Sequence, residues 1–264
     1  MALYKTTYPV VGPVISSLTK RPVYRGGNSG VAFLPTDLSN LLLWLDASDA
    51  STITETLGAV SQWDDKSGNG NHVTQGTASL QPVSGSNTLN SLNVIDFDGS
   101  DALVRTSLGV TGSQNRSLLL VGKSNDSSYN AYFNIGPNTN PNAWTLLSLN
   151  NANQTLSVAI AAGSTPGVGI PANNWNIVGA KLDGTRLRDH SVYLNGAEFL
   201  QTGAATTPID TLDTNIRIGA DFNIANLNGR IAELVFGSID WSNTELNNLG
   251  NYYFDKWGTT WTGL

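Results

Sequence analysis

The sequence predicts an all-β protein in which two antiparallel sheets pack as a sandwich, with an extended N-terminal arm and one short C-terminal helix. From Leu41 onward, short apolar or alternating runs recur about every 10 to 15 residues. Clusters of Asn, Gly, Ser, Asp and Pro separate these runs. Such spacing is typical of all-β sandwiches, whose strands are short and joined by turns.

Several of these runs have the length and composition of strands. They are Leu41–Leu45, Leu92–Phe97, Leu118–Gly122, Tyr129–Ile135, Trp144–Leu149, Thr155–Ile160, Trp175–Leu182, Ser191–Leu194, Ile216–Ile218 and Arg230–Phe236. This number of strands is enough for two packed antiparallel sheets. The clearest turn is Asn195-Gly196, because Asn-Gly readily adopts the two positive φ angles of a type I′ hairpin.

A helix is predicted near the C-terminus. Ser242 and Glu245 have the spacing of a capping box, and Gly258 follows as a helix-ending residue. Between them the apolar residues that share one helical face are Leu246, Leu249, Tyr253 and Trp257. We expect this helix to cover an edge or end of the sandwich.

Residues 1–36 are predicted to form the arm, and residues 37–264 the sandwich. Prolines and glycines interrupt the arm, so no helical period fits it. The arm carries basic residues and no acidic one, whereas the rest of the chain is acidic. Its apolar and basic side chains favour an arm that lies on its own body or on a neighbouring subunit; the alternative is an unstructured tail. The predicted anchoring residues are Tyr4, Tyr8, Lys20, Arg21, Tyr24 and Arg25.

Composition excludes several classes of site and partner. The 264 residues include no cysteine, which excludes a disulfide framework, a thiolate nucleophile and a zinc-thiolate site. A net charge of −6 argues against nucleic acid as the main partner, because phosphate binding needs clustered Lys and Arg. No apolar run is long enough to cross a membrane, and the first residues lack the apolar run of a signal peptide, so no membrane insertion is expected.

Several segments resemble, in the same order, the concanavalin A-like, laminin G-like jelly-roll domains of bacterial and phage surface proteins. The early segments are residues 43–48, 63–71 and 93–101, and the later ones are residues 192–196, 217–219, 228–234 and 255–258. The resemblance covers about residues 38–258 and implies a jelly-roll sandwich. It does not select a function, because lectins, glycan hydrolases, adhesins and structural modules share this fold.

The residues of a catalytic site are not recognised in the sequence. In glucanases that share the fold, the resemblance implies a Glu-x-Asp-x-(x)-Glu run, and none of the four glutamates of this chain lies in such a run. The two histidines, His72 and His190, accompany no G-x-S-x-G motif and are expected at the surface. The sequence therefore predicts that the chain is not an enzyme.

Two kinds of binding site are predicted. Asp96, Asp98 and Asp101 surround a glycine turn and could hold calcium, which relatives of this fold bind near such loops; the alternative is a turn stabilised by Asx hydrogen bonds. No other cofactor is expected. Trp144 and Trp175 lie beside Asn-rich segments and are the candidates for a sugar-binding platform, whereas the tryptophans of the matched segments are expected in the core.

Two functions are consistent with these observations. The first is a non-enzymatic virion structural protein, most simply a bacteriophage capsid decoration or other surface subunit. It would be made in the host cytoplasm, anchored through the arm to other capsid or tail proteins and to copies of itself, and able to bind host-surface glycans through the sandwich. The alternative is a carbohydrate-binding receptor or adhesin module of a phage tail or bacterial surface protein.

Overall fold

The computed structural model describes residues 32–125, 129–137, 143–149, 155–160, 163–171, 173–221 and 226–264. The predicted anchoring residues Tyr4, Tyr8, Lys20, Arg21, Tyr24 and Arg25 lie outside the described residues. The last residues of the predicted arm are described, and Phe33 and Leu34 pack against the apolar cluster beneath the C-terminal helix. The ring of Phe33 meets that of Tyr252 edge-on, with 6.3 Å between the ring centres.

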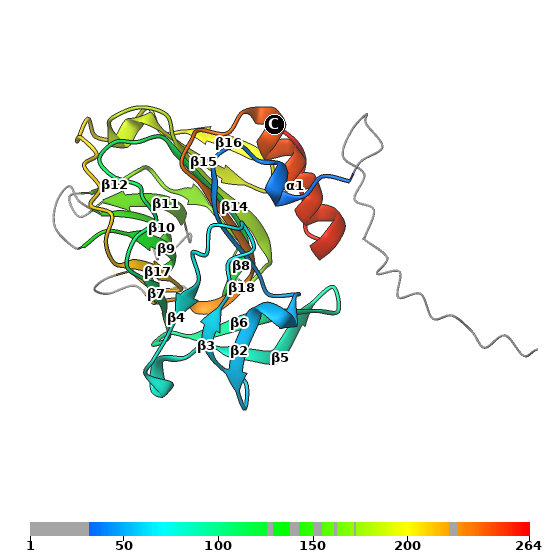
Figure 1. Ribbon diagram of the computed structural model, residues 1–264. Coiled ribbons are helices and arrows are strands. Elements are labelled where there is room, and N and C mark those ends of the chain that lie inside the picture. The colour runs from blue at the N-terminus through cyan, green and yellow to red at the C-terminus, as the bar shows by residue number, and fades with distance from the viewer. Residues whose placement is uncertain are drawn as a thin grey trace, which may run out of the picture.

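The predicted antiparallel all-β fold is confirmed, and its strands form one continuous sheet that folds over into two layers (Figure 1). In the first layer, β18 lies beside β8 on one side and beside β6 and β1 on the other. The strands of this layer are β1 (Leu41–Asp46), β5 (Val83–Leu89), β6 (Leu92–Asp98), β8 (Arg116–Ser124), β14 (Asn176–Leu182), β15 (His190–Leu194), β16 (Ala197–Leu200) and β18 (Asn228–Gly237).

The second layer runs in space from β3 through β4, β7, β17, β9 and β10 to β11. Its strands are β2 (Ile53–Thr56), β3 (Ala59–Trp63), β4 (Val73–Thr74), β7 (Leu103–Arg105), β9 (Asn130–Ile135), β10 (Trp144–Leu149), β11 (Thr155–Ile160), β12 (Gly163–Ser164), β13 (Val168–Gly169) and β17 (Ile216–Ile218). Short 3-10 helices lie in the connections, at Pro35–Asp37, Ala50–Thr52, Ala78–Leu80 and Leu187–Asp189.

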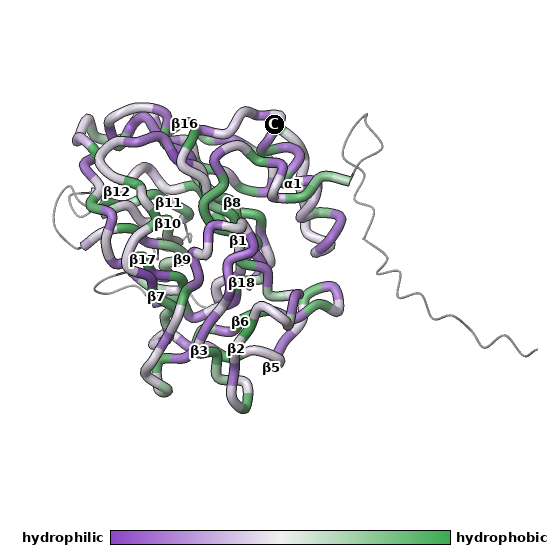
Figure 2. The backbone as a smooth tube through the Cα atoms, viewed as in Figure 1, coloured by the Kyte–Doolittle hydropathy of each residue, from purple (hydrophilic) through white to green (hydrophobic). Residues whose placement is uncertain are grey.

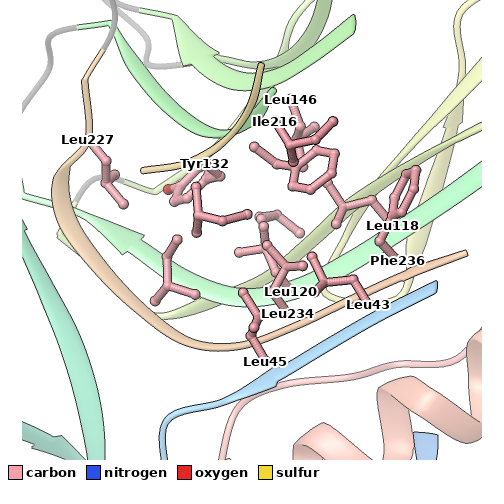
Figure 3. Packing of buried hydrophobic residues seen from close by; sticks show 14 of the residues in the cluster. Leu43, Leu45, Leu118, Leu120, Tyr132, Leu146, Ile216, Leu227, Leu234 and Phe236 are labelled. Carbon is pink, nitrogen blue, oxygen red and sulfur yellow. The ribbon is translucent and has the colours of Figure 1, made fainter. Parts of the chain in front are cut away.

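The main core fills the space between the layers. Successive side chains of a strand point to opposite faces, so Leu118 and Leu120 of β8 enter this core while Leu119 and Val121 point away from it. Figure 3 shows how the inward side chains of both layers meet. Among them are Leu43, Leu45, Leu118, Leu120, Tyr132, Leu146, Ile216, Leu234 and Phe236.

The helix α1 (Asn243–Trp257) covers the outer face of the first layer. Its predicted boundaries are confirmed: Ser242 and Glu245 form the capping box, and Gly258 ends the helix with a φ of 66°. Its apolar face packs on the outward side chains of β8, while the inward side chains of β8 enter the main core. The middle of β8 is accordingly a run of hydrophobic residues, green in Figure 2. The central strands of the first layer, β8 and β18, are therefore buried between the second layer and α1.

Local structure follows the sequence most closely where strands are apolar. The Asn195-Gly196 turn has φ values of 52° and 92°, as the predicted hairpin requires. Each predicted strand is present with its ends shifted by a few residues at most. The strands β2 to β5 were not predicted, because they are short or, like β5, have few buried side chains. Among the described residues, no helix has the length and hydropathy needed to cross a membrane.

Candidate functional site

Three of the segments that carry the resemblance meet at one buried carboxylate. Glu233 of β18 is fully buried and accepts hydrogen bonds from the indole nitrogens of Trp44 and Trp257, both at 2.6 Å. The hydroxyl of Tyr252 donates to it at 3.0 Å, and Nζ of Lys256 at 2.7 Å. Burial raises the pKa of Glu233, against the opposing charge of Lys256. Four donors from β1 and α1 thus fasten the helix to the sheet.

The network continues from Lys256 to the end of β1. Its Nζ lies 2.7 Å from one oxygen of Asp46, and Lys66 lies 2.8 Å from the other. Lys66 also contacts Asp49 at 2.9 Å. Burial alone would raise the pKa of Asp46, but the two lysines hold it below its usual value. Because Asp46, Lys256 and Glu233 are all buried, this network is closed to ligands and belongs to the frame of the fold.

The loop of residues 65–71 closes the open edge of β1. The carboxylate of Asp65 accepts the backbone N–H groups of Trp44, Ser67 and Asn71, each at 2.9 Å. In return, the side chains of Ser67 and Asn71 donate to the carbonyl of Leu42 at 3.0 and 2.8 Å. A sheet edge left open is a template for association with another chain. This motif therefore also has a structural role.

The prediction that Trp144 forms a surface platform for sugar is wrong, because the ring is fully buried in the core. Its Nε1 donates to Nε2 of His190 at 2.7 Å, and Nδ1 of His190 bonds to the carbonyl of Leu187 at 2.8 Å. The expected surface position of His190 is wrong for the same reason. Burial lowers the pKa of His190 to about 4, so its ring is neutral at pH 7 and accepts the indole hydrogen.

The second predicted platform, Trp175, is half-buried at the start of β14 and packs against the cluster beneath α1. Its role in sugar binding stays a prediction. The tryptophans of the matched segments are in the core as expected, with Trp44, Trp63 and Trp257 all buried.

The predicted calcium ligands do not converge. Asp96 forms an ion pair with Arg230 of the neighbouring strand β18. Asp98 accepts the backbone N–H and the hydroxyl of Ser100 at 2.8 and 2.7 Å, and Asp101 accepts the N–H of Asp98 at 2.9 Å. These contacts are the Asx hydrogen bonds of the alternative interpretation. Within the described part of the chain, no group of three or more His, Asp or Glu side chains is placed to hold a metal ion.

A pocket that the sequence did not predict lies on the second layer. Its volume is about 290 Å³, and it lies among β4, β7, β17 and the residues next to them. The inward positions of Ile216 and Ile218 in the core direct Arg217, between them on β17, to the outer face. The lining residues are Thr74, Val104, Arg105, Thr106, Asn215 and Arg217.

Arg105 is held in place by backbone carbonyls. Its Nε donates to the carbonyl of Ser107 at 2.7 Å, and its Nη1 donates to those of Gly70 and His72 at 3.2 and 3.3 Å. Three bonds to the main chain fix the plane of the guanidinium, and they tie the pocket to the loop of residues 65–71. For Nη2, no hydrogen bond to a described residue is found.

Unlike the Nε of Arg105, the Nε of Arg217 makes no hydrogen bond to a described residue. It is also shielded from solvent. A buried donor without an acceptor is unfavourable, and more so in a charged group. None of the lining residues is acidic, so the pocket is positive in a chain whose net charge is −6. A pocket with two arginines and no acidic residue suits a ligand that supplies oxygen acceptors. Strand alternation could have placed Arg217 outward, but not its neighbours in the pocket, because the β7–β17 pairing is not evident from sequence. In that pairing, Arg217 lies opposite Val104 and Arg105 opposite Ile216.

Comparison with known proteins gives relatives by structure only: no family model and no curated protein matches. Domain 4 of AbnA, a GH43 extracellular arabinanase from Geobacillus stearothermophilus solved with arabinotriose, is similar at 14% identity and a TM-score of 0.57, over 80% of this chain and 98% of that one. The Trypanosoma rangeli sialidase solved with sialic acid is similar at 13% identity and a TM-score of 0.57, over 89% of this chain. An arabinofuranosidase solved with arabinofuranosyl-alpha-1,2-xylobiose is similar at 15% identity and a TM-score of 0.58, over 83% of this chain.

These similarities show the β-sandwich fold. This chain spans 36% of the length of the sialidase and 60% of that of the arabinofuranosidase. The prediction that the chain is not an enzyme is contradicted, because the similar structures are those of glycoside hydrolases. The prediction depended on the absence of one glucanase motif. That motif represents a single arrangement of catalytic carboxylates, so its absence does not exclude other arrangements. At 13 to 15% identity the similarity carries the fold and not the activity of those proteins.

Proposed function

We propose that this chain is a carbohydrate-binding β-sandwich domain whose site is the pocket beside β4, β7 and β17. The observation that carries the proposal is a pocket on the outer face that is lined by Arg217 and other polar residues and by no acidic one. The fold supports it, since structures that share this fold were solved with arabinotriose, sialic acid and a xylobiose derivative.

The lining matches the chemistry of a sugar. Hydroxyl groups of Thr74 and Thr106 and the amide of Asn215 can each donate and accept, as sugar hydroxyls do. A volume of about 290 Å³ is near the lower end of the roughly 300–1,000 Å³ that is common for ligand sites. The pocket therefore suits a terminal unit or a short part of a glycan.

The experiment is a binding titration of the full chain with a panel of neutral and acidic oligosaccharides. Thr74→Val removes a pocket hydroxyl at nearly constant shape and should weaken binding about fivefold, as expected for one hydrogen bond. Thr56→Val makes the same change at an exposed position of β2 and should leave affinity unchanged. Absence of binding across the panel would refute the proposal, as would equal effects of the two variants. Assay of the same mixtures for new reducing ends measures hydrolysis.

A role on a virion surface stays a prediction. It rests on the basic and apolar composition of residues 1–36, most of which lie outside the described residues. Normal incorporation into particles by a chain that lacks residues 1–36 would contradict it. Carbohydrate binding is favoured as the main proposal because the structural similarities support it and none of them concerns a virion.

A further inference from the structure

We propose that the pocket selects acidic saccharides, and that Arg105 and Arg217 bind an oxyanion on the sugar. The shared chemistry is a carboxylate or a sulfate ester carried by the glycan. This inference rests on the proposed function, because it names the ligand class of the same pocket.

The first argument is the distribution of charge around the arginines. Two of the other described arginines have carboxylate partners: Arg230 pairs with Asp96, and Arg188 lies 3.8 Å from Asp189. Arg116 and Arg186 instead donate to backbone carbonyls and a threonine hydroxyl. Within the described residues, neither pocket arginine forms a salt bridge. Two unneutralised guanidinium groups therefore line one pocket in an acidic protein, and a ligand that carries a negative charge would be their counterion.

The second argument is preorganisation. Backbone carbonyls already fix Arg105, so little conformational entropy is lost when a ligand binds to it. The Nε of Arg217 is shielded from solvent, so an oxyanion in the pocket would bind the terminal nitrogens of this guanidinium. Guanidinium groups match the geometry of such groups, and bonds between charged partners are roughly twice as strong as neutral ones.

The third argument is the absence of an aromatic platform. Neutral sugars gain much of their affinity by packing an apolar ring face on an aromatic side chain. No aromatic residue lines this pocket, and Trp144, the predicted platform, is buried in the core. The hydroxyl and amide groups of the lining exchange bonds with water at little net gain. The charged pair therefore has to supply most of the affinity.

The test compares ligands that differ only in charge. Oligogalacturonate is titrated against its methyl ester, which keeps the sugar chain and removes the charge. A sulfated oligosaccharide is titrated against its desulfated form in the same buffer. We expect each charged ligand to bind at least about tenfold more tightly than its neutral counterpart. If only one charged ligand binds, that result assigns the oxyanion to carboxylate or to sulfate.

A matched pair of variants tests the residues. Arg217→Gln should weaken binding of the charged ligand about tenfold or more and leave the neutral one almost unaffected. Arg188→Gln is the control, because it removes the same charge from an exposed site outside the pocket. Arg217→Lys keeps the charge and loses the planar fork, and it should recover only part of the affinity. Circular dichroism and the melting temperature establish that all variants are folded.

The outcomes separate this inference from the proposed function. Equal affinity for charged and neutral glycans, with both weakened by Thr74→Val, would overturn the inference and leave the proposed function standing. An equal effect of Arg217→Gln and Arg188→Gln would also overturn it, because net charge alone would then explain the binding. No binding of any glycan would refute both.

Discussion

At the scale of single residues, buried polar side chains whose hydrogen bonds are all internal belong to the fold and are not free to bind a ligand. Glu233 and His190 are both without access to solvent, and each has partners on several sides. The residues next to Glu233 in sequence do not indicate this, because its partner on β1, Trp44, lies 189 residues earlier in the chain. A tryptophan beside Asn-rich residues also looks the same whether it faces solvent or the core. That ambiguity is why Trp144 was placed wrongly.

Replacement of Glu233 should strongly destabilise the protein. In Glu233→Gln the amide presents a donor to four groups that are themselves donors, and Lys256 loses one of its two carboxylates. Breaking a buried charge pair costs about 3–5 kcal/mol, and we expect a loss of that size in the free energy of unfolding by urea. Glu198→Gln on exposed β16 is the control, with an expected loss below about 1 kcal/mol. A loss at Glu233 no larger than at Glu198 would contradict this account.

The buried imidazole of His190 makes stability depend on pH. Its pKa is about 4 in the folded chain and about 6.5 when unfolded, so between these values the unfolded state binds more protons. Stability should therefore fall as the pH falls from about 6.5 to 4, by roughly 2 kcal/mol at pH 5.

Asp101 contributes with the opposite sign in part of this range, since burial raises its pKa to about 6. Urea unfolding is therefore followed in an Asp101→Asn background. NMR of the His190 ring gives the direct measurement, and a midpoint near 6.5 would show that burial does not shift its pKa.

At the scale of elements, the structure separates what sequence pattern can and cannot predict. Apolar strands such as β8 and β18 were located because their side chains pack on both faces. The strand β5 (Val83–Leu89) was missed because most of its side chains are exposed and it has a glycine near its centre. The helix α1 was placed to the residue because its capping signals are local. Pairing between β7 and β17 joins residues more than 100 positions apart, and this pairing forms the pocket.

The loop of residues 65–71 bonds both to the edge strand β1 and, through the carbonyl of Gly70, to the pocket residue Arg105. In Asp65→Ala three backbone N–H groups lose their acceptor, so the loop should detach from β1. We expect a loss of about 2–4 kcal/mol in unfolding free energy and concentration-dependent association through the freed edge, seen by size-exclusion chromatography. Arg105 would lose the carbonyls of Gly70 and His72, so affinity for glycan should fall as well.

Asp64→Ala is the matched control for that loop. Asp64 is a half-exposed neighbour that contacts Gln62 and His72 and does not bond to β1. Its variant should remain monomeric. Association of both variants to the same extent would mean that the loop does not protect the edge.

At the scale of the whole molecule, the central strands β8 and β18 of the first layer are shielded on both faces, by the second layer and by α1, while the pocket lies on the outer face of the second layer. The buried structural contacts and the proposed ligand pocket thus lie on different layers of the sheet. The segments that carry the resemblance fall mainly on the structural side, which explains why they predicted the fold well and the site poorly. Under the proposed function, binding depends on outward residues such as Arg217, which the apolar core does not select.

The contacts of β1 with β18 and α1 also determine when, during synthesis, the first layer of the sheet can form. Trp44 and Asp46 leave the ribosome long before Glu233 and Lys256, yet the network forms only when all four are present. Pairing over such separations is slow, because the entropy of closing a long loop is lost before the contacts stabilise it. Until residue 257 is made, the first strand therefore lacks its final neighbours. Chaperones and proteases would meet an unfinished sheet throughout most of synthesis, and the last helix would end that exposure.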